Sequence, residues 1–164
     1  MNTLYNILWI LLALLLQVVL FNHLYLFGGV ALVYMIALIK MPVEINRNLQ
    51  ILAGFISGLV IDICCNTIGM HALAATTVMW LRMPVLHLYV NAEDVKSGVP
   101  GVNRLGMQEY IRYALTLLSL HCILLYCIES FTMFNLLVLL LKIVVGSLLT
   151  FGAAMALEFA TLKK

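Results

Sequence analysis

The chain has 164 residues, of which 65% are hydrophobic and 10% are charged, and its formal net charge is +2. Its mean hydropathy of +1.12 excludes a soluble domain with a polar shell. Because a helix needs about 20 apolar residues to cross a bilayer, a chain of this length holds about six spans and no separate soluble domain. We therefore expect a single all-α membrane domain over residues 1–164, with no nucleic acid among its partners.

Six apolar segments follow one another along the chain. Residues 11–16 are apolar on every side, which disfavours the alternating pattern of a β-barrel strand. The first segment has no preceding Lys or Arg and no small-residue cleavage motif, so we expect it to remain as a span rather than to act as a cleaved signal peptide. A six-helix membrane bundle is predicted, with spans Leu4–Phe21, Gly29–Met41, Leu49–Cys65, Met70–Val90, Tyr110–Ser130 and Phe134–Ala160.

Eight of the nine basic residues fall in every second gap between these segments. Short cytoplasmic loops are enriched in Lys and Arg, so this alternation predicts six crossings with both termini in the cytoplasm. Five crossings, with the short second segment lying in the interface, would break the alternation. The eight residues flank the second-to-third gap, belong to the fourth-to-fifth connection or end the chain: Lys40, Arg47, Arg82, Lys96, Arg104, Arg112, Lys163 and Lys164.

The connection Asn91–Glu109 is the only sizeable polar segment, and it contains the breaker sequence Ser97-Gly98-Val99-Pro100-Gly101. It is either a docking loop for a cytoplasmic partner or a solvated linker that carries positive-inside charges. The sequence leaves both interpretations open.

Ionisable residues inside the predicted spans indicate where the bundle interior lies, because such groups are costly in hydrocarbon unless they face protein, water or a counter-charge. Asp62, His121, Glu129 and Lys142 are the four such positions that we single out. Lys142 lies roughly 12 Å from the outer end of its span and Asp62 roughly 6 Å, at 1.5 Å per residue. We predict that Lys142 pairs with Asp62 inside the bundle, with Glu129 as the second choice. Snorkelling of Lys142 to the head groups is the alternative.

No motif in the sequence indicates catalysis, a cofactor or a metal. Asp62, Asn66 and His71 lie around one turn, but one histidine and one carboxylate at these spacings are far from a metal-ligand set. We expect Asn66–Gly69 to be a tight turn in which Asp62 and Asn66 satisfy backbone donors. Gly54 and Gly58, and a stripe of Gly152, Ala156 and Ala160, have the spacing of close helix packing, within the bundle or against a partner.

The stretch from Gly54 to Asp62 reads GFISGLVID, and Gly69-Met70-His71-Ala72 follows it. This resembles the signature of the MreD family, in which GF-x-x-GL-x-x-D precedes a G-[LM]-x-A turn, and the whole chain is similar to members from Bacteroidetes-type bacteria. The resemblance implies a rod-shape-determining, non-catalytic protein of the inner membrane that takes part in peptidoglycan synthesis. Its direct partner would be MreC, with RodA, the penicillin-binding transpeptidase and MreB as indirect partners.

The MreD bundle is in turn similar to the substrate-binding S-components of vitamin transporters, which gives an alternative function. Such a subunit needs an outward pocket with convergent polar groups, whereas the outer turns here are short. We therefore expect a scaffold without cofactors, surrounded by membrane lipid. Its contact with MreC is expected at Gly54, Gly58, Asp62, Asn66 and Gly69.

Overall fold

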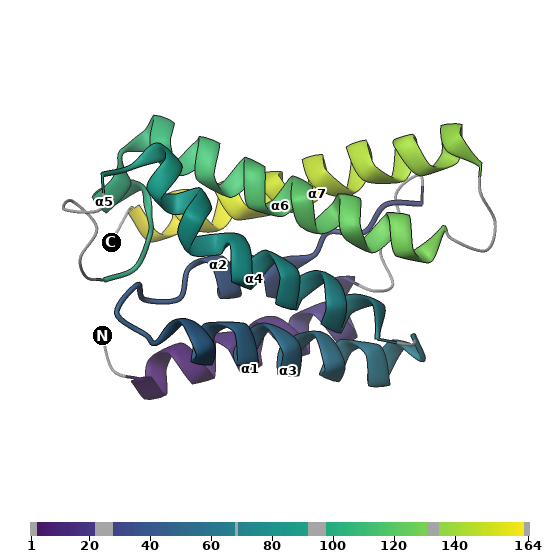
Figure 1. Ribbon diagram of the computed structural model, residues 1–164, viewed down its shortest axis with the longest axis horizontal. Helices are drawn as coiled ribbons and strands as arrows, with labels where there is room; N and C mark the ends of the chain where they lie inside the picture. The colour runs from purple at the N-terminus through teal and green to yellow at the C-terminus, as the bar shows by residue number, and fades with distance from the viewer. Residues whose placement is uncertain (1–2, 22–27, 68, 92–97, 131–134, 163–164) are drawn as a thin grey trace.

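The computed structural model of the protein describes residues 3–21, 28–67, 69–91, 98–130 and 135–162. Every element in these ranges is a helix, which confirms the all-α prediction (Figure 1). In chain order the helices are α1 (Thr3–Val19), α2 (Val33–Ile39), α3 (Arg47–Cys65), α4 (Met70–Tyr89), α5 (Val102–Leu105), α6 (Met107–Glu129) and α7 (Leu136–Leu162).

Three of the described helices are long and apolar enough to cross a membrane by length and composition, namely α3, α6 and residues 136–161 of α7. The apolar part of α1, Asn6–Val19, is shorter. Large apolar side chains are exposed along α1, α3 and α7, as expected for surfaces that face lipid. These features agree with a membrane protein, while the number of crossings and their orientation stay predictions.

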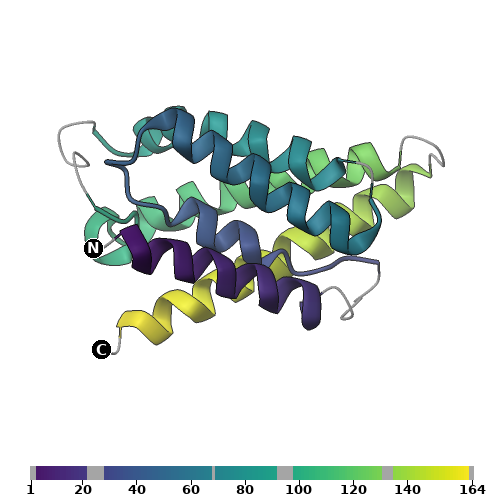
Figure 2. The same ribbon diagram turned by 90° about the horizontal axis from the view of Figure 1, so that it is seen from below.

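The long helices lie roughly along one axis, and both termini lie at the same end of the molecule in both views (Figures 1 and 2). We call this the termini end, and the opposite end, which holds the α3–α4 turn, the far end. Helix α3 packs on α4, α4 on α6 and α6 on α7, while α1 packs on α2 and α3. Helix α2 contacts α1, α3, α4, α6 and α7, so it is the centre of the bundle.

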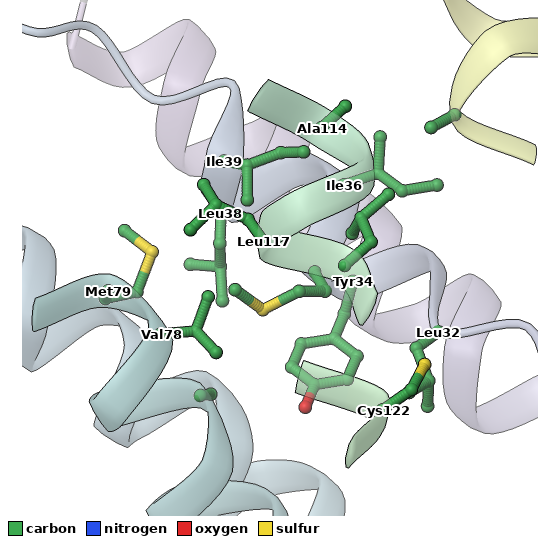
Figure 3. Packing of buried hydrophobic residues seen from close by; sticks show 14 of the residues in the cluster. Leu32, Tyr34, Ile36, Leu38, Ile39, Val78, Met79, Ala114, Leu117 and Cys122 are labelled. Atoms are coloured by element: carbon green, nitrogen blue, oxygen red, sulfur yellow. The ribbon is translucent and has the colours of Figure 1, made fainter. Parts of the chain in front are cut away.

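The second predicted span, Gly29–Met41, is helical only from Val33 to Ile39, and all seven of these residues are buried. Figure 3 shows Leu38 and Ile39 of α2 beside Leu117 of α6, with Val78 and Met79 of α4 nearby. The residues just before Val33 are not helical. Hydropathy alone does not distinguish a helix from a buried irregular segment, so the predicted span is longer than the helix.

Helices α3 and α4 are joined firmly at the termini end. The Asn46 side chain caps α3 by accepting from the Asn48 backbone N–H at 2.9 Å. Pro84 lies inside α4 and has no N–H, which frees the Trp80 carbonyl one turn earlier. Arg47 donates to that carbonyl at 3.0 Å, and its guanidinium lies 5.7 Å from the centre of the Trp80 ring.

Candidate functional site

The α3–α4 turn at the far end is organised by Asp62, which is buried near the end of α3. Its carboxylate accepts from the backbone N–H groups of His71 at 3.1 Å and Ala72 at 2.9 Å, and from the Thr67 hydroxyl at 2.5 Å. The two N–H groups belong to the first turn of α4, which has no partners within its own helix. Asp62 therefore acts as an N-cap supplied by the neighbouring helix, and its negative charge suits the positive end of the α4 dipole.

Asn66 and Gly69 make the tight turn possible, as predicted. Both have left-handed backbone conformations, with φ of +54° and +69°. Asn66 ends α3 by donating its N–H to the Asp62 carbonyl, and Gly69 is the residue before α4. Ile68, between them, lies outside the described residues. Asn66 and Gly69 are both exposed, so this turn is accessible at the far end.

Gly54 and Gly58 lie on the face of α3 that packs against α4. A Cβ atom at Gly58 would lie 2.5 Å from both the Ala72 Cα and the His71 carbonyl oxygen, and one at Gly54 would lie 2.7 Å from the Met79 side chain. The two glycines let the helices approach closely within the bundle. Both are buried. Of the two alternatives for these glycines, the structure shows packing within the bundle, and a contact with MreC stays a prediction.

Lys142 pairs with Glu129 rather than with Asp62. Its ammonium donates to the Glu129 carboxylate at 2.8 Å, and the two side chains are 23% and 42% exposed. The prediction of a buried Lys142–Asp62 pair is wrong because backbone N–H groups and a hydroxyl already occupy Asp62. The second-choice partner is the observed one, and the pair lies near the surface of the far end instead of inside the bundle.

The non-helical chain before α2 obtains its hydrogen bonds from side chains of three other helices. The backbone N–H of Val30 donates to the Tyr126 hydroxyl at 3.0 Å, that of Leu32 to the Thr150 hydroxyl at 3.0 Å, and that of Val33 to the Gln17 amide oxygen at 2.7 Å. Irregular backbone in a membrane is stable only where protein or water satisfies it. These three contacts come from α6, α7 and α1, so they fix α2 to the whole bundle.

Gly29 allows the same segment to lie against α7. A Cβ atom there would lie 2.8 Å from the Gly146 backbone nitrogen. A larger residue would push the segment away from α7 and weaken the bond between Leu32 and Thr150.

The other end of α2 is held by Arg82, which is fully buried in α4. Its guanidinium donates to the carbonyls of Ile39 and Met41, to the Gln50 amide oxygen and to the Tyr113 hydroxyl. Tyr113 in turn donates to the Ile39 carbonyl at 2.8 Å. Arg82 was expected in the polar connection, and this was wrong because it lies inside α4. Its position inside the predicted span Met70–Val90, eight residues before the end, is the signal that could have revealed it.

A buried polar chain connects α2, α4 and α6. The Tyr34 hydroxyl lies 2.9 Å from His121 Nε2 and 3.4 Å from His71 Nδ1. The Tyr34 ring meets both imidazoles edge to face. This explains His121, one of the interior ionisable residues that we singled out, as a hydrogen-bonded core residue. Among the described residues, no group of three or more His, Cys, Asp or Glu side chains could hold a metal ion.

Glu158 of α7 joins three elements at the termini end, and it was not among the residues singled out from the sequence. Its carboxylate is buried and accepts from Lys40 at 2.6 Å and from the Val102 backbone N–H at 2.7 Å.

The segment that begins at Gly98 contacts the residues before α3. The Gly98 carbonyl accepts from the Val43 N–H at 2.9 Å, and the Gly98 N–H donates to the Glu44 carboxylate at 2.8 Å. The described part of the Asn91–Glu109 connection is therefore packed on the bundle, and residues 92–97 lie outside the described ranges.

Two regions of the molecule contain cavities. At the far end, a cavity of about 160 Å³ is lined by residues that include His71, Tyr126 and Glu129. Between α1 and α7, two cavities of about 360 and 250 Å³ follow each other along the bundle.

No family model matches this chain, and neither a curated protein nor a solved structure matches it.

Proposed function

We propose that the protein is a non-catalytic scaffold of the bacterial cell-elongation complex, an MreD-type protein of the inner membrane that binds MreC. The residues of the GF-x-x-GL-x-x-D pattern support this proposal, because Gly54, Gly58 and Asp62 serve one structural purpose. The glycines bring α3 against α4, and Asp62 caps α4. The pattern therefore holds α3 and α4 together as a rigid pair. A rigid helix pair suits a protein that offers the outward faces of its helices to partners.

The proposed orientation places the termini end in the cytoplasm. Lys40 ends α2, Arg47 begins α3, and Arg104 and Arg112 lie on α5 and in the first turns of α6, all at this end. Short cytoplasmic segments are enriched in basic residues. The far end, with the Asn66–Gly69 turn, would then face the periplasm, where the bulk of MreC lies according to the resemblance.

The outward face of α3 is the surface that we propose for MreC. It carries an uninterrupted row of exposed apolar side chains at helical spacing: Leu52, Phe55, Ile56, Leu59 and Ile63. Residues three and four apart share one helix face, so a transmembrane helix can pack along the row. The row leads directly to the exposed Asn66 turn, so a partner helix would emerge at the far end beside it. RodA, the penicillin-binding transpeptidase and MreB would be reached through MreC.

The cavity at the far end supports the scaffold over a vitamin-binding S-component. Its volume of about 160 Å³ is well below the 300–1,000 Å³ that is typical of small-molecule sites. Glu129, which lines it, is already paired with Lys142. The exposed row on α3 is the single observation that carries the scaffold proposal.

Capture of partners from the membrane tests this function. The tagged protein is extracted from cells with a mild detergent, and the proteins that copurify are identified. We expect MreC in the wild-type sample and much less in an Ile56→Trp variant. A Leu140→Trp variant is the matched control, because Leu140 is 51% exposed on α7 and Ile56 is 50% exposed on α3. Recovery of a coupling ATPase pair, or of a bound vitamin, in place of MreC would overturn the proposal.

A further inference from the structure

The two cavities between α1 and α7 adjoin and form one groove. Trp9 of α1 and Ala37 of α2 line both of them. The larger cavity lies at the termini end and the smaller lies deeper in the bundle, and Figure 2 shows α1 and the last turns of α7 spreading apart toward the termini end. Among the residues that line the two cavities, none belongs to α3, so the scaffold proposal does not use this groove.

The chemistry of the groove changes along its length. The smaller cavity is lined only by apolar side chains, among them Leu12 and Leu16 of α1 and Ala156 of α7. The larger cavity is lined by polar side chains as well, including Asn6 and Glu158. A ligand with an apolar tail and a polar head fits this gradient.

The ionic groups that line the larger cavity already have partners of their own. Lys40 donates to one carboxylate oxygen of Glu158 at 2.6 Å, and the Val102 backbone N–H donates to the other at 2.7 Å. Arg104 likewise has an interaction partner. The described part of the lining therefore does not call for a counter-ion, which favours a head group without charge.

Asn6 of α1 is the buried polar side chain of this lining that has no hydrogen bond to any described residue. It is only 9% exposed, and it faces the larger cavity. A side-chain amide offers two donors and one acceptor oxygen, and leaving such groups unpaired in a buried place is costly. A hydroxyl group can donate and accept at once, so a hydroxyl on the head of a ligand would satisfy Asn6.

We propose that this groove binds a glyceride, a lipid whose uncharged head carries hydroxyl groups, with one acyl chain in the smaller cavity and a hydroxyl beside Asn6. Lys40 keeps two N–H donors that an ester oxygen of the same head can accept. The apolar lining extends from Trp9 to Phe21, which is about 18 Å at 1.5 Å per residue. One leaflet of the hydrocarbon core is about 15 Å deep, half of the usual thickness, so the smaller cavity matches one acyl chain.

A partner helix does not fit the groove. A helix about 10 Å across fills roughly 420 Å³ in each turn. The larger cavity has a volume of about 360 Å³ and the smaller about 250 Å³, so neither holds a single turn. A single acyl chain is much thinner and can lie along both.

Native mass spectrometry of the delipidated full-length protein tests the proposal. The protein in maltoside detergent is mixed with equimolar monooleoylglycerol, methyl oleate and palmitoyl-oleoyl phosphatidylglycerol, and the retained lipids are counted. Methyl oleate has the same acyl chain and an ester but no hydroxyl. Because one net hydrogen bond changes an affinity by about two- to tenfold, we expect monooleoylglycerol to be retained about fivefold over each of the others. Millimolar free glycerol should not displace it, because the acyl chain contributes to binding.

Three results would overturn the proposal. Equal retention of monooleoylglycerol and methyl oleate would show that no head group is recognised. Stronger retention of phosphatidylglycerol would show that the site selects an anion. Displacement by free glycerol alone would show that the smaller cavity holds no acyl chain.

An Asn6→Leu variant tests the amide while keeping the volume of the side chain. It should retain monooleoylglycerol and methyl oleate equally, whereas Asn48→Leu should keep the wild-type preference, since Asn48 is exposed on α3 and does not line the groove. Asn6→Leu should also resist dodecyl sulfate at least as well as the wild type, because its amide has no hydrogen bond to lose. Lower resistance would give Asn6 a structural role, and an unchanged lipid preference would show that it does not contact the head. Either result would contradict the proposal.

A second pair of variants locates the acyl chain. Leu12→Trp fills the smaller cavity and should lower the retention of monooleoylglycerol about fivefold. Leu11→Trp should retain it like the wild type, since Leu11 is exposed on the same helix but does not line the groove. Ala156→Leu narrows the groove from α7 and replaces Leu12→Trp if that variant does not fold. Equal retention by the filling variant and by Leu11→Trp would place the chain elsewhere and refute the assignment.

Discussion

Replacing Arg82 with Met is the most severe test of how α2 is held. Methionine is similar in length but donates no hydrogen bond, so the Met41 carbonyl and the Gln50 amide oxygen lose the hydrogen bonds that Arg82 donates to them. The Ile39 carbonyl keeps the Tyr113 hydroxyl at 2.8 Å. A buried acceptor without a partner costs about 1–3 kcal/mol, so two of them lower the free energy of unfolding by about 2–6 kcal/mol.

The loss can be measured by titrating the purified protein with dodecyl sulfate in maltoside micelles and following helicity by circular dichroism. Arg112→Met is the control, because Arg112 is exposed on α6 and its replacement should change stability by no more than about 0.5 kcal/mol. Arg82→Lys keeps the charge but not the planar set of donors, so it should fall between the two. If Arg82→Met unfolds at the same dodecyl sulfate fraction as Arg112→Met, the reasoning is refuted.

Three further predictions follow from the contacts of single residues. Gly58→Ala places a Cβ against the α4 backbone and should destabilise the protein by about 1–3 kcal/mol. Gly152→Ala places a Cβ that meets nothing within 4 Å and should stabilise the protein by up to about 1 kcal/mol. If Gly58→Ala proves more stable than Gly152→Ala in the same titration, the packing of α3 on α4 is contradicted. Lys142→Leu breaks only a partly exposed pair with Glu129, so it should cost at most about 1 kcal/mol and leave the yield of monodisperse protein on size exclusion unchanged. Thr150→Val removes the hydroxyl that accepts from the buried Leu32 N–H before α2, so it should cost about 1–3 kcal/mol. A titration curve equal to that of the wild type would show that the Leu32 N–H needs no partner.

Much of the fold follows from hydropathy and from local signals. Helix α4 begins at Met70 and α3 ends at Cys65, as predicted, because the polar turn between them interrupts two long apolar segments. The short helix α5 lies in a connection that the sequence marks only as polar, so its packing on Glu158 could not be inferred. Contacts between segments far apart in the chain leave no periodic signal.

The shortness of α2 could not be read from the sequence. Residues 29–41 are apolar enough for a span, and what ends the helix early is a set of side chains from other helices that bind its flanking backbone. Gln17 and Thr150 are unremarkable in isolation, and Arg82 was assigned to the following connection. Their role depends on which helices are neighbours.

The sequence correctly predicted where the turn at the candidate site lies, but it gave some of the contacts of Asp62 wrongly. Asp62 was expected to satisfy backbone donors at the turn, and it does so for α4. The same residue was also assigned to Lys142, and the two roles compete for one carboxylate. Glu158 was missed because it lies near the end of a predicted span, where a charge is ordinarily taken to face water, and Arg82 was missed because it was counted with the basic residues of the following connection.

Site-specific photo-crosslinking in cells that contain MreC tests the central claim most directly. A benzophenone amino acid replaces either Ile56 on the outward face of α3 or Leu140 on α7, two positions of nearly equal exposure. The account predicts an MreC adduct from position 56 at least fivefold more abundant than the adduct from position 140. Equal adducts from both positions, or an adduct from position 140 alone, would contradict it.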